Sequence, residues 1–429
     1  MGTRMGTYET AYWLTDTWGM TRRESRSGAY HPYRPDCISH LELSLPSHAV
    51  SAVACAESAM RELNSSPGPL TDTEPLARLI LRAEALASSR IEGLEMPAGR
   101  LLEYEALDEL GIPHRVDGTE AAVMGNIIAM RDGVDRAAEL PLLTVDALCA
   151  INARLLEGTV AAPYAGRLRG EQNWIGGSRV SPLGAAYVPP RPELVPELME
   201  DLMDFCNNTD LPAIAAAAIA HAQMETIHPF ADGNGRTGRA LVHVILRRRG
   251  VAPRVVPPIS LVLATDRERY IERLASYRTT TELGSPESNE AIVSWVTYFS
   301  DACTISCERA RAFEERIDDI RRNWRDALRP RANSAADLLI DALPSTPVVS
   351  VESAAQLIGR SREAARNAIS SLVNVGILHQ SAKNRKSNIF AARDVLDAFT
   401  SYERALAVPG GDTASEKVAR HVPQRAQRR

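Results

Sequence analysis

Apolar residues recur at three- and four-residue steps through most of this chain of 429 residues. Leu76, Ile80 and Ala87 lie on one such stripe, which ends before Gly93 and Pro97. This spacing places the apolar side chains on one face of a helix, and that face must be buried against other helices. Further segments with the same pattern are 49–62, 119–137, 144–157, 192–207, 211–226, 238–249, 266–278 and 288–325. The sequence therefore predicts a mainly α-helical protein.

One segment, 166–190, has a different pattern. Short extended runs at Trp174-Ile175 and at Tyr187-Val188 flank a glycine-rich turn, and prolines end the second run. Such an arrangement is typical of a β-hairpin. The exposed edge of a hairpin can add a strand of another protein through main-chain hydrogen bonds, although an ordinary structural hairpin has the same pattern.

Composition and charge exclude several classes of protein. Lys and Arg total 49 against 54 Asp and Glu, so the formal net charge is −5, which argues against coating nucleic acid or membrane by bulk charge. The six cysteines show no zinc-type pairs, so neither a metal nor a disulfide framework is expected. The longest apolar run, 211–222, is about half of the ~20 residues that a membrane span needs. A reduced, cytoplasmic protein without a membrane segment is predicted.

The 228–239 segment, HPFADGNGRTGR, concentrates residues that suit phosphate chemistry. Gly233 and Gly235 allow a tight turn and the close approach of a ligand. The helix predicted to follow presents free N–H groups and the positive end of its dipole to an anion. Arg236 and Arg239 are three residues apart, so both lie on one side of that helix.

Two side chains of this segment supply chemistry beyond anion binding. Asp232 is an oxygen ligand suited to Mg²⁺, and His228 can take a proton near neutral pH. A base, a metal ligand, an anion cradle and two arginines within one short segment indicate phosphoryl or nucleotidyl transfer. A capped surface loop is the alternative for an isolated Asp-Gly-Asn-Gly, but it does not account for the whole string.

The 228–239 segment resembles the Fic family signature HxFx(D/E)GNGRxxR, with every fixed position present. The resemblance implies a helical core that transfers AMP from ATP to a Tyr, Thr or Ser hydroxyl of a target protein. It implies that His228 deprotonates the hydroxyl, that Phe230 anchors the loop and that Asp232 holds Mg²⁺. The residues implied for ATP phosphate binding are Gly233, Asn234, Gly235, Arg236, Gly238 and Arg239.

Two further segments are similar to parts of the family's site. The hairpin resembles the flap that aligns a target's extended backbone beside the site. Its candidate docking residues are Trp174, Ile175, Tyr187 and Val188. Tyr270 lies where the family often contacts the nucleobase and is a candidate stacking residue, although a core or rim tyrosine fits the pattern as well.

Residues 88–93, SSRIEG, resemble the Fic inhibitory motif (S/T)xxxE(G/N). Ser88 and Glu92 are four residues apart and share a helix face. The resemblance implies that Glu92 pairs with Arg239 and obstructs the γ-phosphate of ATP, since a carboxylate and a phosphate compete for the same charge. A solvated glutamate at a helix end is the alternative for so short a motif.

Changes in composition and the Fic resemblance divide the chain into five regions. An N-terminal helical region, 1–115, contains the inhibitory helix at about 74–93 and precedes the Fic catalytic core, 116–310. A linker helix, 311–330, leads to a unit at 331–405 that looks like a winged helix-turn-helix, and 406–429 is predicted to be a disordered tail.

The 331–405 unit leaves two kinds of partner open. Arg362 and Arg366 would lie on the exposed face of its recognition helix, and Lys383, Arg385 and Lys386 in its wing, where DNA phosphates could be contacted. Acids nearly balance bases over this unit, so a wing that binds protein or mediates dimerisation fits equally well.

We therefore predict a protein adenylyltransferase that Glu92 restrains. Removal of AMP at the same site, with Glu92 orienting a water, is one alternative. A DNA-binding regulator that uses the core as a nucleotide sensor is another, although sensing needs no base such as His228. The chain itself as a target and a second copy in a homodimer are kept as further partners.

Overall fold

The computed structural model describes residues 6–14, 26–65, 74–109, 117–178, 180–380 and 389–405. The predicted tail, 406–429, and the predicted wing residues Lys383, Arg385 and Lys386 lie outside these residues.

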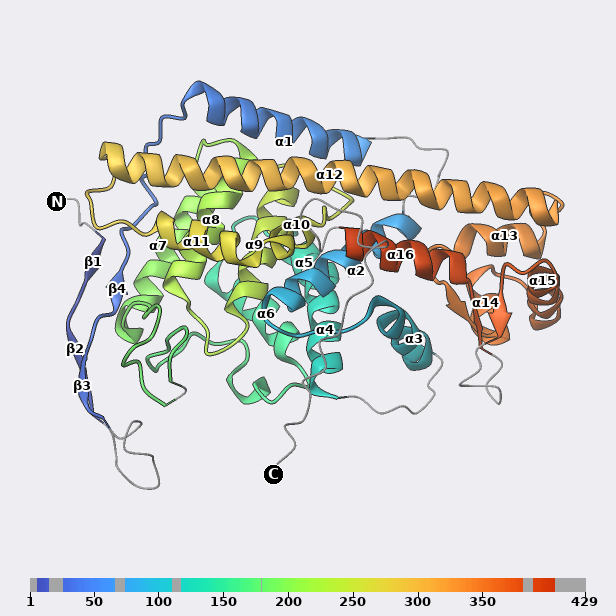
Figure 1. Ribbon diagram of the computed structural model, residues 1–429, viewed down its shortest axis with the longest axis horizontal. Helices are drawn as coiled ribbons and strands as arrows, with labels where there is room; N and C mark the ends of the chain where they lie inside the picture. The colour runs from blue at the N-terminus through green and yellow to red at the C-terminus, as the bar shows by residue number, and fades with distance from the viewer. Residues whose placement is uncertain are drawn as a thin grey trace, which may run out of the picture.

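The fold is mainly helical, as predicted, and its strands are short (Figure 1). The helices are α1 (Ser47–Ser65), α2 (Glu74–Ile91), α3 (Ala98–Glu109), α4 (Gly118–Ile128), α5 (Val134–Glu139), α6 (Val145–Leu156), α7 (Val195–Asn208), α8 (Ala213–Ile227), α9 (Asn234–Arg248), α10 (Ile259–Thr265), α11 (Arg267–Tyr277), α12 (Pro286–Leu328), α13 (Ala335–Ala342), α14 (Val351–Leu357), α15 (Arg362–Asn374) and α16 (Arg393–Ala405). The strands are β1 (Thr7–Tyr8), β2 (Ala11–Trp13), β3 (Gly28–Tyr30), β4 (Tyr33–Arg34), β5 (Val348–Val349), β6 (His379–Gln380) and β7 (Phe390–Ala391).

Helix α8 forms the centre of the core. All of its residues are buried, because its alanine-rich sequence offers an apolar or small side chain in nearly every direction. Helices α7, α9 and α12 pack around it. Trp295 of α12 donates its indole N–H to the Ala218 carbonyl of α8 at 2.7 Å. The 228–239 segment follows directly after α8, so it begins on a rigid support.

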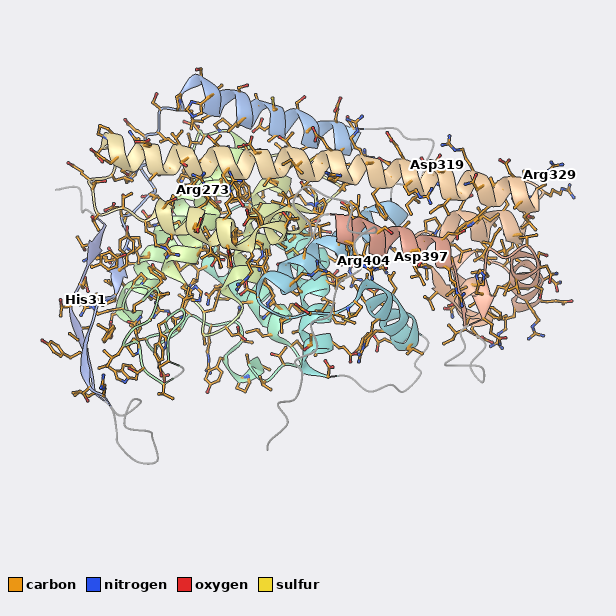
Figure 2. The ribbon with its side chains drawn as sticks, in the orientation of Figure 1. His31, Arg273, Asp319, Arg329, Asp397 and Arg404 are labelled. Atoms are coloured by element: carbon orange, nitrogen blue, oxygen red, sulfur yellow. The ribbon has the colours of Figure 1, made fainter. Side chains whose placement is uncertain are left out.

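Helix α12 runs along the whole molecule, with α1 packed beside it (Figure 1). Ser285 caps its start and Pro286 occupies the first turn. At 43 residues it is about 65 Å long. Asp319 of α12 and Arg329, which follows its last residue, are exposed (Figure 2). The helix continues across the domain boundary predicted at residue 310, so the core and the predicted linker helix are joined without a break.

The N-terminal strands form a narrow ribbon at one end of the molecule (Figure 1). Strand β1 pairs antiparallel with β4, and β2 pairs antiparallel with β3, in the register Ala11 to Tyr30 and Trp13 to Gly28. Trp13 packs edge-on against Trp174, with ring centroids 5.4 Å apart. The ribbon therefore lies against the segment that the sequence predicts as a hairpin.

The C-terminal unit lies beside the far end of α12 (Figure 1). It runs α13, β5, α14, α15, β6, β7, α16, and its antiparallel sheet has the order β5-β7-β6. This order agrees with the expected winged helix-turn-helix, which stays a prediction. Arg362 and Arg366 are exposed, as expected, but Arg362 forms an ion pair with Glu352. Helix α16 then returns to pack against α3 and α12.

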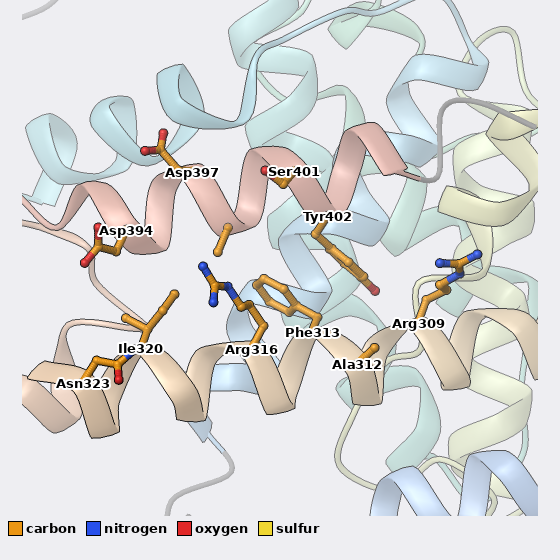
Figure 3. A pocket seen from close by; sticks show the side chains of 11 residues that line it. Arg309, Ala312, Phe313, Arg316, Ile320, Asn323, Asp394, Asp397, Ser401 and Tyr402 are labelled. Atoms are coloured by element: carbon orange, nitrogen blue, oxygen red, sulfur yellow. The ribbon is translucent and has the colours of Figure 1, made fainter. Parts of the chain in front are cut away.

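A groove of about 570 Å³ lies alongside the contact between α12 and α16 and is lined by both helices (Figure 3). Its lining includes Arg309 and Arg316 from α12 and Asp394 and Asp397 from α16. It contains none of the predicted site residues. Among the described residues, no helix is long and apolar enough to cross a membrane.

Candidate active site

The 228–239 segment forms the loop between α8 and α9. After α8 ends, His228 adopts a left-handed backbone with φ of 51° and ψ of 58°. Residues other than glycine rarely adopt this conformation, so other contacts have to hold it. Gly233, with φ of 77°, is the N-cap of α9. These two turns bring the start of α9 next to the end of α8, against which it packs.

Buried contacts within the loop fix its shape. Phe230 is fully buried, and its N–H donates to Asn234 Oδ1 at 2.7 Å. The Asn234 amide in turn donates to the Phe230 carbonyl at 2.8 Å. Thr237 Oγ1 donates to the Gly233 carbonyl, also at 2.8 Å. Phe230 therefore lies in the core, where an anchor of the loop is expected.

Arg236 projects from the first turn of α9 and is only 3% exposed. It donates to the Ala122 carbonyl at 3.4 Å, but its Nε has no hydrogen-bond partner among the described residues. Burial lowers the pKa of this guanidinium. Since an unpaired buried donor costs about 1–3 kcal/mol, the arrangement favours an anion that would accept from Arg236.

Arg239 is paired. Its guanidinium donates to Ser88 Oγ, to the Ser88 carbonyl and to Glu92 Oε1, each at 2.8 Å. Burial alone would raise the pKa of Glu92, but the charge and hydrogen bond of Arg239 lower it. The structure thus brings together the three residues Ser88, Glu92 and Arg239 that the sequence singled out, although Glu92 and Arg239 are 147 positions apart.

Glu92 reaches the start of α9 over Gly235. A Cβ atom on Gly235 would overlap Glu92 Oε1 and would lie 3.0 Å from Arg239 Nη1. The lack of a side chain therefore lets the carboxylate approach the free N–H groups of the first helical turn. An anion bound at this helix terminus and at Arg239 would need the space that the Glu92 carboxylate takes.

His228 is suited to accept a proton at neutral pH. Burial lowers the pKa of its imidazole to about 4, and the charge of Arg169 adds to this effect. Its Nδ1 has no hydrogen-bond partner among the described residues. At neutral pH the ring is therefore uncharged.

Two other titratable groups, Glu225 and His221, lie on α8 close to α9. A Cβ on Gly238 would lie 3.1 Å from each of them, so the glycine permits close packing of the two helices. Burial raises the pKa of Glu225 to about 7 and lowers that of His221 to about 3. Both groups are thus less charged than in water.

Tyr270 lies in the core rather than at an open surface. It is 2% exposed, its hydroxyl lies 2.7 Å from His221 Nε2, and its ring packs against Trp295. Contact of Tyr270 with a nucleobase stays a prediction.

Asp232 is exposed on the loop, and its Oδ1 accepts from the Gly233 N–H at 2.7 Å. In the described parts of the chain, no three His, Cys, Asp or Glu side chains gather closely enough to hold a metal ion. A single exposed carboxylate fits a magnesium ion that takes its remaining ligands from phosphate oxygens and water.

The predicted hairpin lies beside the loop. Its two arms meet at one antiparallel bridge, where Ile175 and Tyr187 exchange main-chain bonds of 2.8 and 3.2 Å. Asn173 donates its amide to the carbonyls of His228 and Phe230, at 3.3 and 3.1 Å. The base of the hairpin is therefore attached to the loop itself.

The four candidate docking residues differ in exposure. Ile175 is 38% exposed, and Trp174 is half-buried against Trp13. Tyr187 and Val188 are each 7% exposed. Of these four residues, the two on the first arm of the hairpin therefore offer more side-chain surface to a partner.

Two residues that support the loop were missed in the sequence. Asn152 of α6 is fully buried and donates to the Asp232 carbonyl at 3.0 Å and to Thr237 Oγ1 at 3.3 Å. The sequence feature that could have identified Asn152 is its position as a single asparagine on the apolar face of the predicted 144–157 helix. Arg169 donates to the His228 carbonyl at 2.9 Å, and no local pattern marked it.

Replacing Asn152 by alanine is expected to lower the free energy of unfolding by about 1–3 kcal/mol, because buried carbonyl and hydroxyl groups lose their partner. Urea unfolding followed by circular dichroism measures this change. Asn208→Ala serves as the control, since Asn208 is exposed at the end of α7. Equal stabilities of the two variants would contradict a supporting role for Asn152.

Comparison with known proteins gives a consistent result. The model of the Fic/DOC family matches residues 142–246, and that of the Fic/DOC family N-terminal region matches residues 50–135. A protein adenylyltransferase fic-1 from Caenorhabditis elegans is 34% identical over 118 residues, which are 27% of this chain and 21% of that protein. A protein adenylyltransferase Fic from Nematostella vectensis is 35% identical over 135 residues, 31% of this chain and 28% of that protein. The matched region thus spans between a fifth and a third of these relatives.

The fold has a solved counterpart. A crystal structure of a Fic family protein from Desulfovibrio desulfuricans G20 superposes with a TM-score of 0.50 at 22% identity, covering 81% of this chain and 97% of that one. At this identity the likeness concerns the fold alone. Residues 50–135 and 142–246 of this chain therefore match the two Fic/DOC family models, and the related sequences and the shared helical fold agree with that match.

Proposed function

We propose that this chain is a protein adenylyltransferase, which transfers AMP from ATP to a side-chain hydroxyl of a target protein. The observation that carries the proposal is that Arg239, Arg236 and His228 all lie close enough to the Glu92 carboxylate, at the N-terminus of α9, to lower its pKa. The matched relatives are named protein adenylyltransferases, which supports the same activity.

The start of α9 supplies the phosphate site. Free N–H groups of the first turn, the positive end of the helix dipole and the Arg236 guanidinium converge there, and all favour negative charge. Arg239 would bind an outer phosphate once Glu92 leaves it. Gly233 and Gly235 carry no side chain to obstruct the phosphate chain.

The transfer needs one proton acceptor. The target oxygen forms a bond to the α-phosphorus, the bond from that phosphorus to the bridging oxygen breaks, and pyrophosphate leaves. His228 takes the hydroxyl proton, and general-base catalysis of this kind contributes roughly 10²–10⁴-fold. The arginines and the helix terminus are fixed before the reaction, so they can stabilise the transferring phosphate without rearranging.

Magnesium would be held by Asp232 together with phosphate oxygens. When bound, it neutralises part of the phosphate charge. The exposed carboxylate of Asp232 beside the start of α9 is the feature that fits it.

Glu92 would act as the restraint. Its carboxylate already pairs with Arg239 and overlaps the space above Gly235, so ATP and Glu92 compete for one guanidinium. The target would dock on the first arm of the hairpin, near Trp174 and Ile175. Self-modification, a homodimer and DNA contact through 331–405 stay predictions, since no described contact bears on them.

The pH dependence of the reaction should reflect the low pKa of His228. In the Glu92→Gly variant, the initial rate is expected to persist as the pH falls below 6.5, because burial lowers the pKa of His228 to about 4 and this variant lacks the Glu92 charge, which raises that pKa. Rates at each pH, with ATP binding and circular dichroism measured alongside, test this. A midpoint near 6.5, with binding and fold unchanged, would contradict the assignment.

Mass spectrometry of proteins from cells that express the Glu92→Gly variant tests the function and names the target. The expected result is the mass of AMP added to Tyr, Thr or Ser of one or more proteins. The Glu92→Gly, His228→Ala double variant is the matched control and should give no such adducts. Identical adducts in both samples would exclude this chain as their source.

A further inference from the structure

The side chain of Arg169 lies buried between the hairpin and the end of α8. It is 6% exposed, and no carboxylate among the described residues lies within ion-pair distance of it. Burial lowers the pKa of its guanidinium only to about 10, so the group keeps its charge at neutral pH. A buried cation without an anionic partner is costly, so its hydrogen bonds have to compensate for lost hydration.

Those bonds all go to main-chain carbonyls. Nε donates to the His228 carbonyl at 2.9 Å, and Nη2 donates to the Ile227 carbonyl at 3.4 Å. Nη1 donates to the Glu171 carbonyl at 3.0 Å, and Nη2 also donates to the Pro190 carbonyl at 2.6 Å. One guanidinium therefore connects the end of α8 to both ends of the hairpin segment.

The position suits a cation for a further reason. The last carbonyls of a helix have no partner within it and carry the negative end of the dipole. Arg169 supplies donors for two carbonyls at the C-terminus of α8, where the chain turns left-handed at His228. Its own N–H donates to the Pro229 carbonyl at 2.9 Å, which ties the backbone on both sides of that turn.

The hairpin is attached to α8 by neighbouring bonds as well. The Tyr187 hydroxyl donates to the Thr226 carbonyl of α8 at 2.7 Å, and Gln172 joins the two arms of the hairpin by donating to the Pro189 carbonyl at 2.9 Å. Arg169 donates both to carbonyls at the two ends of the hairpin segment and to the main-chain carbonyl of His228, the proposed catalytic base.

We propose that Arg169 is a positioning residue, which holds His228 in its left-handed conformation and fixes the distance from its imidazole to the hairpin that docks the target. This inference rests on the proposed adenylyltransferase function. A lysine could replace the charge but not the planar set of donors, so the geometry of the guanidinium is the essential property. Displacement of a catalytic group by about 1 Å can cost on the order of 10²-fold in rate.

The test compares Arg169→Ala and Arg169→Lys with the Glu92→Gly parent, each made in that parent. Both are expected to lower the rate of target labelling about a hundredfold while ATP affinity stays within about threefold, because Arg169 touches no phosphate-binding group. Millimolar methylguanidinium should restore part of the rate in Arg169→Ala. Arg167→Ala is the matched control, since Arg167 is exposed two residues away and its contacts with described residues, a bond to the Pro163 carbonyl and packing over the Tyr164 ring, do not reach His228 or α8.

A second readout does not depend on activity. The imidazole of His228, followed by NMR, should titrate at a higher pH in Arg169→Ala than in the parent, because a nearby positive charge is gone. Arg169→Lys keeps the charge and should titrate close to the parent. If Arg169→Ala does not fold, the labelling rate of Arg169→Lys alone tests the positioning role. Parent-like labelling in either folded variant overturns the positioning role, whereas absence of labelling in the parent contradicts the proposed function instead.

Discussion

Replacing Glu92 by glycine is expected to raise the rate of AMP transfer by about tenfold to a hundredfold. The carboxylate accepts a charge-assisted hydrogen bond from Arg239 at 2.8 Å. Such bonds contribute about 1.5–3 kcal/mol, and about 1.4 kcal/mol corresponds to a factor of ten. In the proposed mechanism ATP would have to displace this contact before its outer phosphate reached Arg239, so removing the carboxylate would remove that cost. Initial rates of labelling at saturating target and fixed ATP measure the change.

Two controls separate the charge of Glu92 from its size. Glu92→Gln keeps the shape of the side chain but not its charge, so its rate should lie between those of the wild type and Glu92→Gly. Glu95→Gly makes the same substitution at an exposed acid three residues further along, which no described ion pair involves, and should leave the rate unchanged. A Glu92→Gly variant no faster than the wild type would rule out restraint by Glu92.

Replacing His228 by alanine in the Glu92→Gly variant is expected to lower the rate by about 10²–10⁴-fold, the range that general-base catalysis contributes. The affinity for ATP should change by less than about threefold, since the proposed phosphate site consists of the start of α9 and the arginines rather than the imidazole. Initial rates and equilibrium binding of ATP are the two measurements. His48→Ala is the control, because His48 is exposed at the start of α1. A rate that survives the loss of His228 would show that another group takes the proton.

The helices could be predicted because each buries one continuous apolar stripe. The predicted 211–226 segment corresponds to α8, and 288–325 corresponds to most of α12. Helices α3 and α10 were missed. Helix α10 lies between Pro257-Pro258 and Asp266, and so short a segment does not show the repeated apolar spacing of a helix. The N-terminal strands are two or three residues long, too short for an alternating pattern to be recognised.

The candidate site could be predicted where its residues are consecutive. The loop from His228 to Arg239 is one such stretch, and the short motif around Glu92 is another. Arg169 and Asn152 could not be assigned roles, because they bond to carbonyls 59 and 80 positions away and share no local motif with them. From its place in the chain, Tyr270 was a candidate for contact with a nucleobase or for a core or rim position; tertiary packing puts it against His221 in the core, and its contact with a nucleobase stays a prediction.

The central claim, that the transferred group is AMP, is tested most directly by the position of the label in ATP. Purified Glu92→Gly protein is incubated with lysate, Mg²⁺ and ATP labelled at either the α- or the γ-phosphate. The account predicts labelled protein from α-labelled ATP, none from γ-labelled ATP, and none from either when His228 is also replaced by alanine. Labelled protein from γ-labelled ATP would show phosphate transfer instead, and no label from the α-position would contradict the proposed adenylyltransferase activity.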